Sequence, residues 1–216
     1  MELPLFPLNT VLFPGASMPL HIFEERYKQM IGMCLEERRP FGVLLIRQGN
    51  EVGEPAEPFE VGTTAHIVRV QHLPDGRLNL VCAGGQRFRV LRVVRTDPYL
   101  AGEVELLLAP AAEEPGTEQM AGSARALYAE YVRLQLALTN QWTRRLEMPA
   151  DPARLADFIG AHAAVSLWVK QRILEETSAR TRLAVEIELL GDAIRNITPR
   201  VEAARTTRWR SLGAMD

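Results

Sequence analysis

The feature that most constrains the fold is a change in hydrophobic periodicity halfway along the chain. Up to about residue 108, apolar residues tend to alternate with polar ones, whereas from residue 118 they recur every three or four positions. The segment Ala109–Gly116 between them is rich in Pro, Ala and Glu, which is typical of a linker. Strands first and helices later predict an α+β protein with subdomains over 1–112 and 113–204 and a flexible tail over 205–216.

The first half predicts short strands. Leu3–Leu5 and Val11–Phe13 are interrupted by prolines, which cannot donate to a sheet, so we expect edge or bulged strands there. Phe41–Ile46 is almost entirely apolar and predicts a strand buried on both faces. Turns at Pro74-Asp75-Gly76 and Gly84-Gly85 punctuate the remaining strands, which are expected over 63–73, 77–83, 88–94 and 104–108. Strands of this number and spacing predict a small closed barrel.

One helix is expected within this half. An apolar stripe runs from Phe23 to Leu35 at helical spacing, and Pro40 requires the helix to end before it. The stripe consists of Phe23, Tyr27, Met30, Ile31, Cys34 and Leu35.

The second half predicts three or four helices. The first runs from Glu118 to about Leu146, with Trp142 on its apolar face, and the others are capped by Asp151, Ser166 and Thr177 or Ser178. In the last helix, apolar residues from Leu183 to Val201 alternate by four and three, a seam that needs a helical partner. That partner is either the helix from Glu118 or, in a homodimer, a second copy. Pro199 is expected to kink or end this helix.

Charge and composition exclude several classes of protein. Of the 216 residues, 25 are Lys or Arg and 27 are Asp or Glu, a net charge of −2 that argues against a general binder of nucleic acid or anionic membranes. The chain starts without the basic segment of a signal peptide and has no apolar run long enough to span a membrane. Two isolated cysteines suit a reducing compartment, so we expect a cytoplasmic protein.

Known catalytic patterns are missing. There is no GxxxxGK[ST] loop and no GxGxxG, so no nucleotide cofactor is expected. The four histidines are scattered, and His66 and His72 would stand about 20 Å apart along a strand, too far to share a metal ion. Ser166 and Lys170 have the spacing of an acyl-transfer dyad, but a helix cap explains Ser166 better. We therefore predict no catalytic residue, no cofactor and no metal.

Two other features have simple structural explanations. Glu24 and Glu25 begin the first helix, where acidic side chains complement the helix dipole. Cys34 and Cys82 fall on expected core faces and should be buried and unreactive.

The apolar N-terminus is the best candidate for binding. It carries too many apolar residues, too often interrupted by proline, for one regular buried strand, so some could line an exposed groove; the alternative is that they simply close the barrel. Arg26 or Arg89 could pair with a backbone or carboxylate oxygen of a ligand. The candidate apolar contacts are Phe6, Phe13, Pro14, Met18, Phe23 and Tyr27.

The same residues carry a family resemblance. Residues 3–15 (LPLFPLNTVLFPG) and 19–27 (PLHIFEERY) resemble the opening of the Lon protease N-terminal substrate-binding domain. Residues 41–43, 61–63, 73–77 and 87–90 follow in that family's order, and the C-terminal helices are similar more weakly. The resemblance spans roughly residues 1–200. It implies a PUA-like β pseudo-barrel with one inserted helix, followed by an α-helical bundle, in a bacterial protein related to proteolysis.

The resemblance also implies a function. Lon's ATPase and peptidase motifs have no counterpart in these residues, so we expect a stand-alone, non-enzymatic module that binds apolar or partly unfolded polypeptide segments or a specific protein partner. The alternative is an RNA-binding PUA-like module, suggested by Trp209 among the arginines of 205–210.

Overall fold

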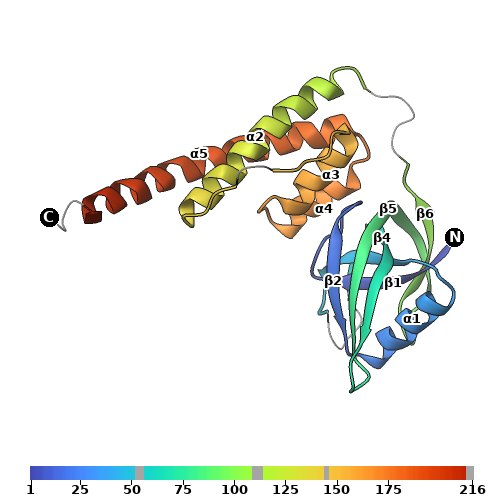
Figure 1. Cartoon of the computed structure of the whole chain (residues 1–216). Helices are drawn as coiled ribbons and strands as arrows, with labels where there is room; N and C mark the ends of the chain where they lie inside the picture. Colours follow the sequence, from blue (N-terminus) through green and yellow to red (C-terminus); the bar gives the residue numbers. More distant parts are fainter. Residues whose placement is uncertain (52–55, 109–113, 144–145, 213–216) are drawn as a thin grey trace. The chain divides into compact units, whose positions relative to one another are not determined.

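The computed structural model describes residues 1–51, 56–108, 114–143 and 146–212, and Figure 1 shows its elements. The chain forms two compact units, Met1–Ala111 with Gly160–Thr177, and Ala112–Ile159 with Ser178–Asp216. Residues 160–177, which the periodicity groups with the helical subdomain, thus belong to the β-rich unit. The linker residues 109–113 lie outside the described residues.

The described residues of the first unit form six strands, two complete helices and the last residues of a third, and the α+β class is confirmed. The sheet order is β2-β5-β4-β3-β1-β6, and β5 also pairs with β6. Because β6 pairs with both β1 and β5, the pairings among β1, β3, β4, β5 and β6 form a closed cycle, with β2 added outside it. The strands are β1 (Glu2–Leu8), β2 (Ser17–Ile22), β3 (Phe41–Gln48), β4 (Glu57–His72), β5 (Leu78–Arg95) and β6 (Ala101–Leu106).

The N-terminal strand, predicted as an edge or bulged strand, is not a simple edge strand, because it pairs with two strands in succession. The first part of β1 pairs with β6 at Glu2–Pro4, and the second part pairs with β3 at Leu5–Leu8. Each part of β1 pairs with a neighbouring strand on one side only. A proline, which has no N–H to donate, can therefore be accommodated facing the unpaired side. Val11–Phe13 is a loop rather than a strand, although Phe13 is fully buried.

The predicted turn at Gly84-Gly85 is also wrong, because β5 runs through both glycines. A Cβ on Gly84 would lie 2.1 Å from the carbonyl oxygen of Phe13, so only glycine allows the loop before β2 to approach this closely. Past this point β5 changes partner: Leu78–Ala83 pair with β2, and Phe88–Arg95 pair with β6. The glycines therefore mark a change of pairing within one strand.

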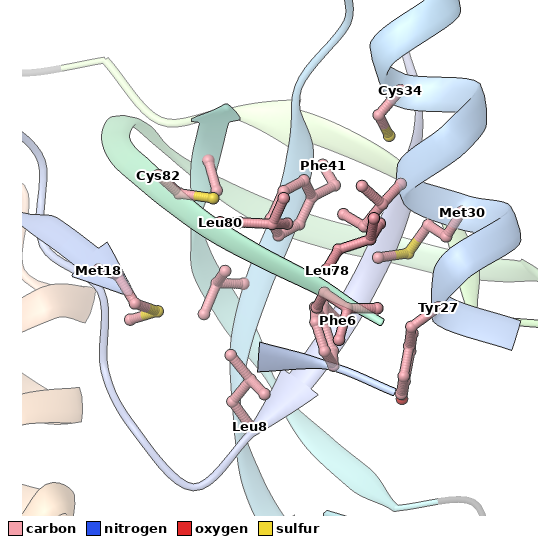
Figure 2. Close-up of a cluster of buried hydrophobic side chains, with 14 of the residues drawn as sticks. Phe6, Leu8, Met18, Tyr27, Met30, Cys34, Phe41, Leu78, Leu80 and Cys82 are labelled. Atoms are coloured by element: carbon pink, nitrogen blue, oxygen red, sulfur yellow. The ribbon is translucent and has the colours of Figure 1, made fainter. Parts of the chain in front are cut away.

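Helix α1 (Glu25–Glu36) buries the predicted stripe, except for Phe23 and Leu35. Phe23 precedes the helix and is 47% exposed. The helix ends before Pro40 as predicted, because Arg38 adopts a left-handed conformation (φ 52°). Figure 2 shows the resulting core, in which side chains from β1, β2, α1, β3 and β5 converge.

Helix α4 (Leu167–Glu175) is attached to the sheet through two buried polar side chains. Arg87 of β5 donates from Nε to the carbonyl of Leu174 at 2.9 Å, and Gln171 donates from Nε2 to the carbonyl of Val61 at 3.0 Å. Ser166 accepts a hydrogen bond from the Val169 N–H, which confirms its predicted role as the cap. These contacts place α4 within the first unit.

The second unit is built from α2 (Thr117–Leu138), most of α3 (Pro152–His162) and α5 (Ala179–Leu212). The predicted seam packs against α2, so it has a helical partner within the chain. Four of its members, Leu183, Leu190, Ile197 and Val201, are at most 7% exposed, and Ile187 and Ile194 are partly buried. Asp151 and Ser178 cap α3 and α5 by accepting from the N–H groups of Arg154 and Thr181.

Two helix ends differ from the predictions. Helix α2 stops at Leu138, because Asn140 is left-handed (φ 60°) and the Asn140 and Gln141 N–H groups bond back to the last turn. Trp142 therefore lies outside the helix and is 73% exposed. Helix α5 continues through Pro199 to Leu212, so residues 205–212 are helical rather than a frayed tail. Burial of Ile197 and Val201 on either side offsets the backbone hydrogen bond that the proline removes.

A buried charged cluster lies in the second unit. Arg182 Nε is 3.7 Å from Asp157 Oδ1, and Arg182 also donates to the Ala153 carbonyl at 3.3 Å. Glu186 follows one turn later on α5, and all three charged side chains belong to residues at most 6% exposed.

Candidate functional site

A cavity of about 780 Å³ lies in the first unit along the whole length of β2. Its walls are the end of β1, the loop over residues 9–12, the start of α1 and Glu51. Ala161, His162 and Lys170, which precede or belong to α4, complete it. The cavity is therefore assembled from segments more than 100 residues apart.

Four of the predicted binding residues line this cavity: Phe6, Met18, Phe23 and Tyr27. Phe6 and Tyr27 are stacked with ring centroids 4.0 Å apart, and both are nearly buried. Met18 is 8% exposed, so these three side chains form an apolar floor, whereas the half-exposed Phe23 ring is accessible.

The other four predicted residues are placed differently. Phe13 is fully buried, and neither it nor Pro14 is among the lining residues. Arg26 lies beside the cavity, where it pairs with Glu24 at 2.9 Å and stacks over the Tyr27 ring at 4.6 Å. Arg89 lines a second concavity of about 670 Å³, together with Arg47, Glu57 and Phe59, so the structure does not bring it to the first cavity.

The outer edge of β2 faces no other described strand, since β2 pairs with β5 alone. The Gly84 N–H bonds to the Ala16 carbonyl, so in this antiparallel pair the even-numbered residues turn their backbone groups toward β5. Ser17, Pro19 and His21 consequently turn theirs toward the outer edge. Pro19 has no N–H, so the outer edge lacks one hydrogen-bond donor at this position but keeps its other donors and acceptors.

Lys170 brings a cation to the cavity. Its Nζ donates to the carbonyl of Ala161 at 2.6 Å, and desolvation by burial lowers the pKa of the ammonium group. Ser166, one turn earlier, is engaged in capping, and the structure records no contact between the two side chains that an acyl-transfer dyad would need. Sequence reasoning considered Lys170 only as a member of that dyad and missed its position in the cavity.

The acidic residues of the cavity are already engaged. Glu24 pairs with Arg26, and Glu51 accepts a hydrogen bond from the Asn9 N–H at 2.9 Å. His21 shares a 2.8 Å hydrogen bond with Asn79 of β5.

The cysteines are structural. Both Cys34 and Cys82 are buried, and burial raises the pKa of each thiol to about 11. Within the described ranges, no three His, Cys, Asp or Glu side chains gather as a metal ion would require. No helix in those ranges combines the length and apolar character needed to cross a membrane.

Residues 2–192 match the family model of the ATP-dependent protease La (LON) substrate-binding domain. The chain belongs to this family. Among full-length relatives of the Lon substrate-binding domain family, the Lon protease of Xanthomonas oryzae pv. oryzae is 31% identical over 198 residues, and that of Anaeromyxobacter dehalogenans is 30% identical over 191 residues. The matches cover 90% and 87% of this chain but only 23% of each relative.

Solved structures of Lon N-terminal domains have the same fold. A Lon N-terminal domain protein from Xanthomonas campestris matches with a TM-score of 0.63 and 29% identity, over 88% of this chain and 98% of that one. The N-terminal domain of Lon protease from the Mycobacterium avium complex matches with a TM-score of 0.68 at 20% identity, over 89% and 99% of the two chains, and this likeness concerns the fold alone.

Proposed function

We propose that this chain is a polypeptide-binding module that holds apolar or partly unfolded segments in the cavity along β2. Membership of a substrate-binding domain family supports binding of polypeptides. The observation that carries the proposal is the combination of an apolar floor, an accessible Phe23 ring and an exposed strand edge around one cavity.

The strand edge supplies contacts that do not depend on sequence. An extended segment could add to β2, because the outer edge offers N–H groups at Ser17 and His21 and carbonyls at Ser17, Pro19 and His21. Backbone hydrogen bonds of this kind suit an unfolded client, whose backbone is exposed whatever its side chains. Phe6, Met18 and Phe23 would take apolar side chains from the face of the bound segment that points into the cavity.

The finer parts of the proposal rest on the family and the topology. The closed cycle of strand pairing supports a PUA-like pseudo-barrel. The engaged Ser166 and the buried thiols support a binding module without peptidase or ATPase activity of its own, and we propose a cytoplasmic location. The RNA alternative is not favoured: the net charge is −2, and the Trp209 side chain lies outside the described residues.

The direct test titrates the protein into a fluorescently labelled, permanently unfolded polypeptide and follows anisotropy at low and high salt. Saturable binding that survives high salt is expected, because apolar burial is not screened, whereas phosphate contacts weaken steeply with salt. No saturable binding at tens of micromolar protein would refute the proposal.

A pair of surface variants locates the site. Phe23→Ala removes an exposed ring from the cavity and should weaken binding about threefold to tenfold, since fully burying an aromatic side chain contributes about 1.5–3 kcal/mol and about half of this ring is still exposed. Val68→Ala, which truncates a 67% exposed side chain of β4 outside the cavity, is the matched control and should bind normally. Equal affinities for the two variants would place the site elsewhere.

A further inference from the structure

Lys170 is the one residue of the cavity whose charge no described carboxylate neutralises. Its Nζ carries three donors, and the structure gives it one acceptor, the neutral carbonyl of Ala161 at 2.6 Å. None of the ion pairs among the described residues includes Lys170. The chain's other lysine, Lys28, is paired with Glu25 at 2.8 Å.

The surroundings of Lys170 favour pairing with an anionic group of a bound ligand. The side chain is half-buried, and desolvation lowers the pKa of its ammonium group, so a nearby negative charge would stabilise the charged form. Glu24 and Glu51 line the same cavity, but Arg26 and the Asn9 N–H already engage them. An incoming carboxylate would therefore find a partly desolvated cation, with which a charge-assisted hydrogen bond is stronger than in water.

We propose that the cavity selects extended polypeptide segments that carry an Asp or Glu side chain among apolar residues, and that Lys170 Nζ pairs with that carboxylate. The inference rests on the proposed function and names the class of segment bound. An internal acidic side chain is the source, rather than a chain terminus, because β2 borders the cavity along all six of its residues and a bound strand would run on past either end.

The test uses two labelled octapeptides, blocked at both ends, that are identical except for one central Asp or Asn in an apolar, extended sequence. Blocking leaves the Asp side chain as the only carboxylate. Wild-type protein is expected to bind the Asp peptide about tenfold more tightly, which corresponds to one good ion pair. Lys170→Met, which keeps the apolar stem, should bind both peptides equally, and Lys170→Arg should keep the preference because it keeps the charge.

A pH series keeps the test decisive even if Lys170→Met folds poorly. In the wild type the preference should weaken as the pH is raised to 10, because desolvation lowers the pKa of Lys170 and a neutral amine no longer attracts the carboxylate. In Lys170→Arg it should persist at pH 10. The other titratable groups of the cavity, His21, Glu24, Tyr27, Glu51 and His162, are unchanged in both proteins and serve as the internal control.

The outcomes separate the two proposals. If both peptides bind with equal affinity to the wild type, or if Lys170→Met keeps the preference, the acidic-segment inference fails and the polypeptide-binding function stands. If neither peptide binds at tens of micromolar protein and the unfolded polypeptide does not bind either, both fail.

Discussion

Replacing Arg87 by Met should loosen α4 from the sheet. The Arg87 residue is 8% exposed, and its Nε–H donates to the carbonyl of Leu174, in the last turn of α4, at 2.9 Å. Methionine keeps an apolar stem in place but removes the donor, so a carbonyl at the end of the helix loses its charged partner. Such a bond contributes about 1.5–3 kcal/mol, and a cation at a helix C-terminus adds a few tenths to about 1 kcal/mol.

The expected loss is therefore about 2–3 kcal/mol, which raises the population with α4 detached by about 30- to 150-fold. Hydrogen exchange measures this directly, because amides of α4 that open locally should exchange faster by the same factor while those of α2 and α5 remain unchanged. Since Lys170 lies on α4 and lines the cavity, polypeptide affinity should fall as well.

Arg89→Met is the matched control. Arg89 is on the same strand two residues later, but it is exposed, and its truncation should change stability by less than about 0.5 kcal/mol. If the Arg87 and Arg89 variants show the same exchange in α4, the bond to Leu174 does not hold the helix and the reasoning is wrong.

Three further predictions concern stability and reactivity. Arg182→Met removes the buried cation that faces Asp157 and should cost about 3–5 kcal/mol in chemical denaturation; a loss below about 1 kcal/mol would contradict a buried ion pair. Gly62→Ala places a Cβ 2.2 Å from the Val43 carbonyl oxygen and should destabilise the protein by about 3 kcal/mol or more. Gly32→Ala, in open space within α1, should instead stabilise it by about 0.5–1 kcal/mol. The opposite order of melting temperatures would disprove this packing. At pH 8 Cys34 and Cys82 should react with a thiol reagent about 100-fold more slowly in native than in denatured protein. Burial raises the pKa of each thiol from 9.0 to about 11, so the reactive thiolate is about 100-fold less populated in the native state. Equal rates would show that the thiols are exposed.

Local signals in the sequence determined most of the elements. The continuous apolar run Phe41–Ile46 is buried along its length, as expected of a strand covered on both faces. Caps at Asp151, Ser166 and Ser178 are formed by side chains bonding to N–H groups three residues away, an interaction within one helical turn. Such features need no distant partner, so the sequence alone suffices to predict them.

Prediction failed where contacts with other parts of the structure, or the backbone conformation of one residue, override the local sequence pattern. Gly84 looks like a turn in the sequence, but a close approach of the Phe13 backbone requires the glycine within a continuous strand. Trp142 fits the helical period, yet left-handed Asn140 ends α2 before reaching it. The six-residue β2, interrupted by Pro19, gave no strand pattern and is held by its pairing with β5.

The candidate site shows the same division. Phe6, Met18, Phe23 and Tyr27 belong to the N-terminal segment that carries the family resemblance, so the sequence by itself identified one wall of the cavity. Lys170 joins them because Arg87 and Gln171 attach α4 to the sheet through hydrogen bonds between residues that are 87 and 110 positions apart in the sequence. Contacts over such separations arise from the packing of the whole unit and have no local signature, and the cation in the cavity was therefore decided by the tertiary structure.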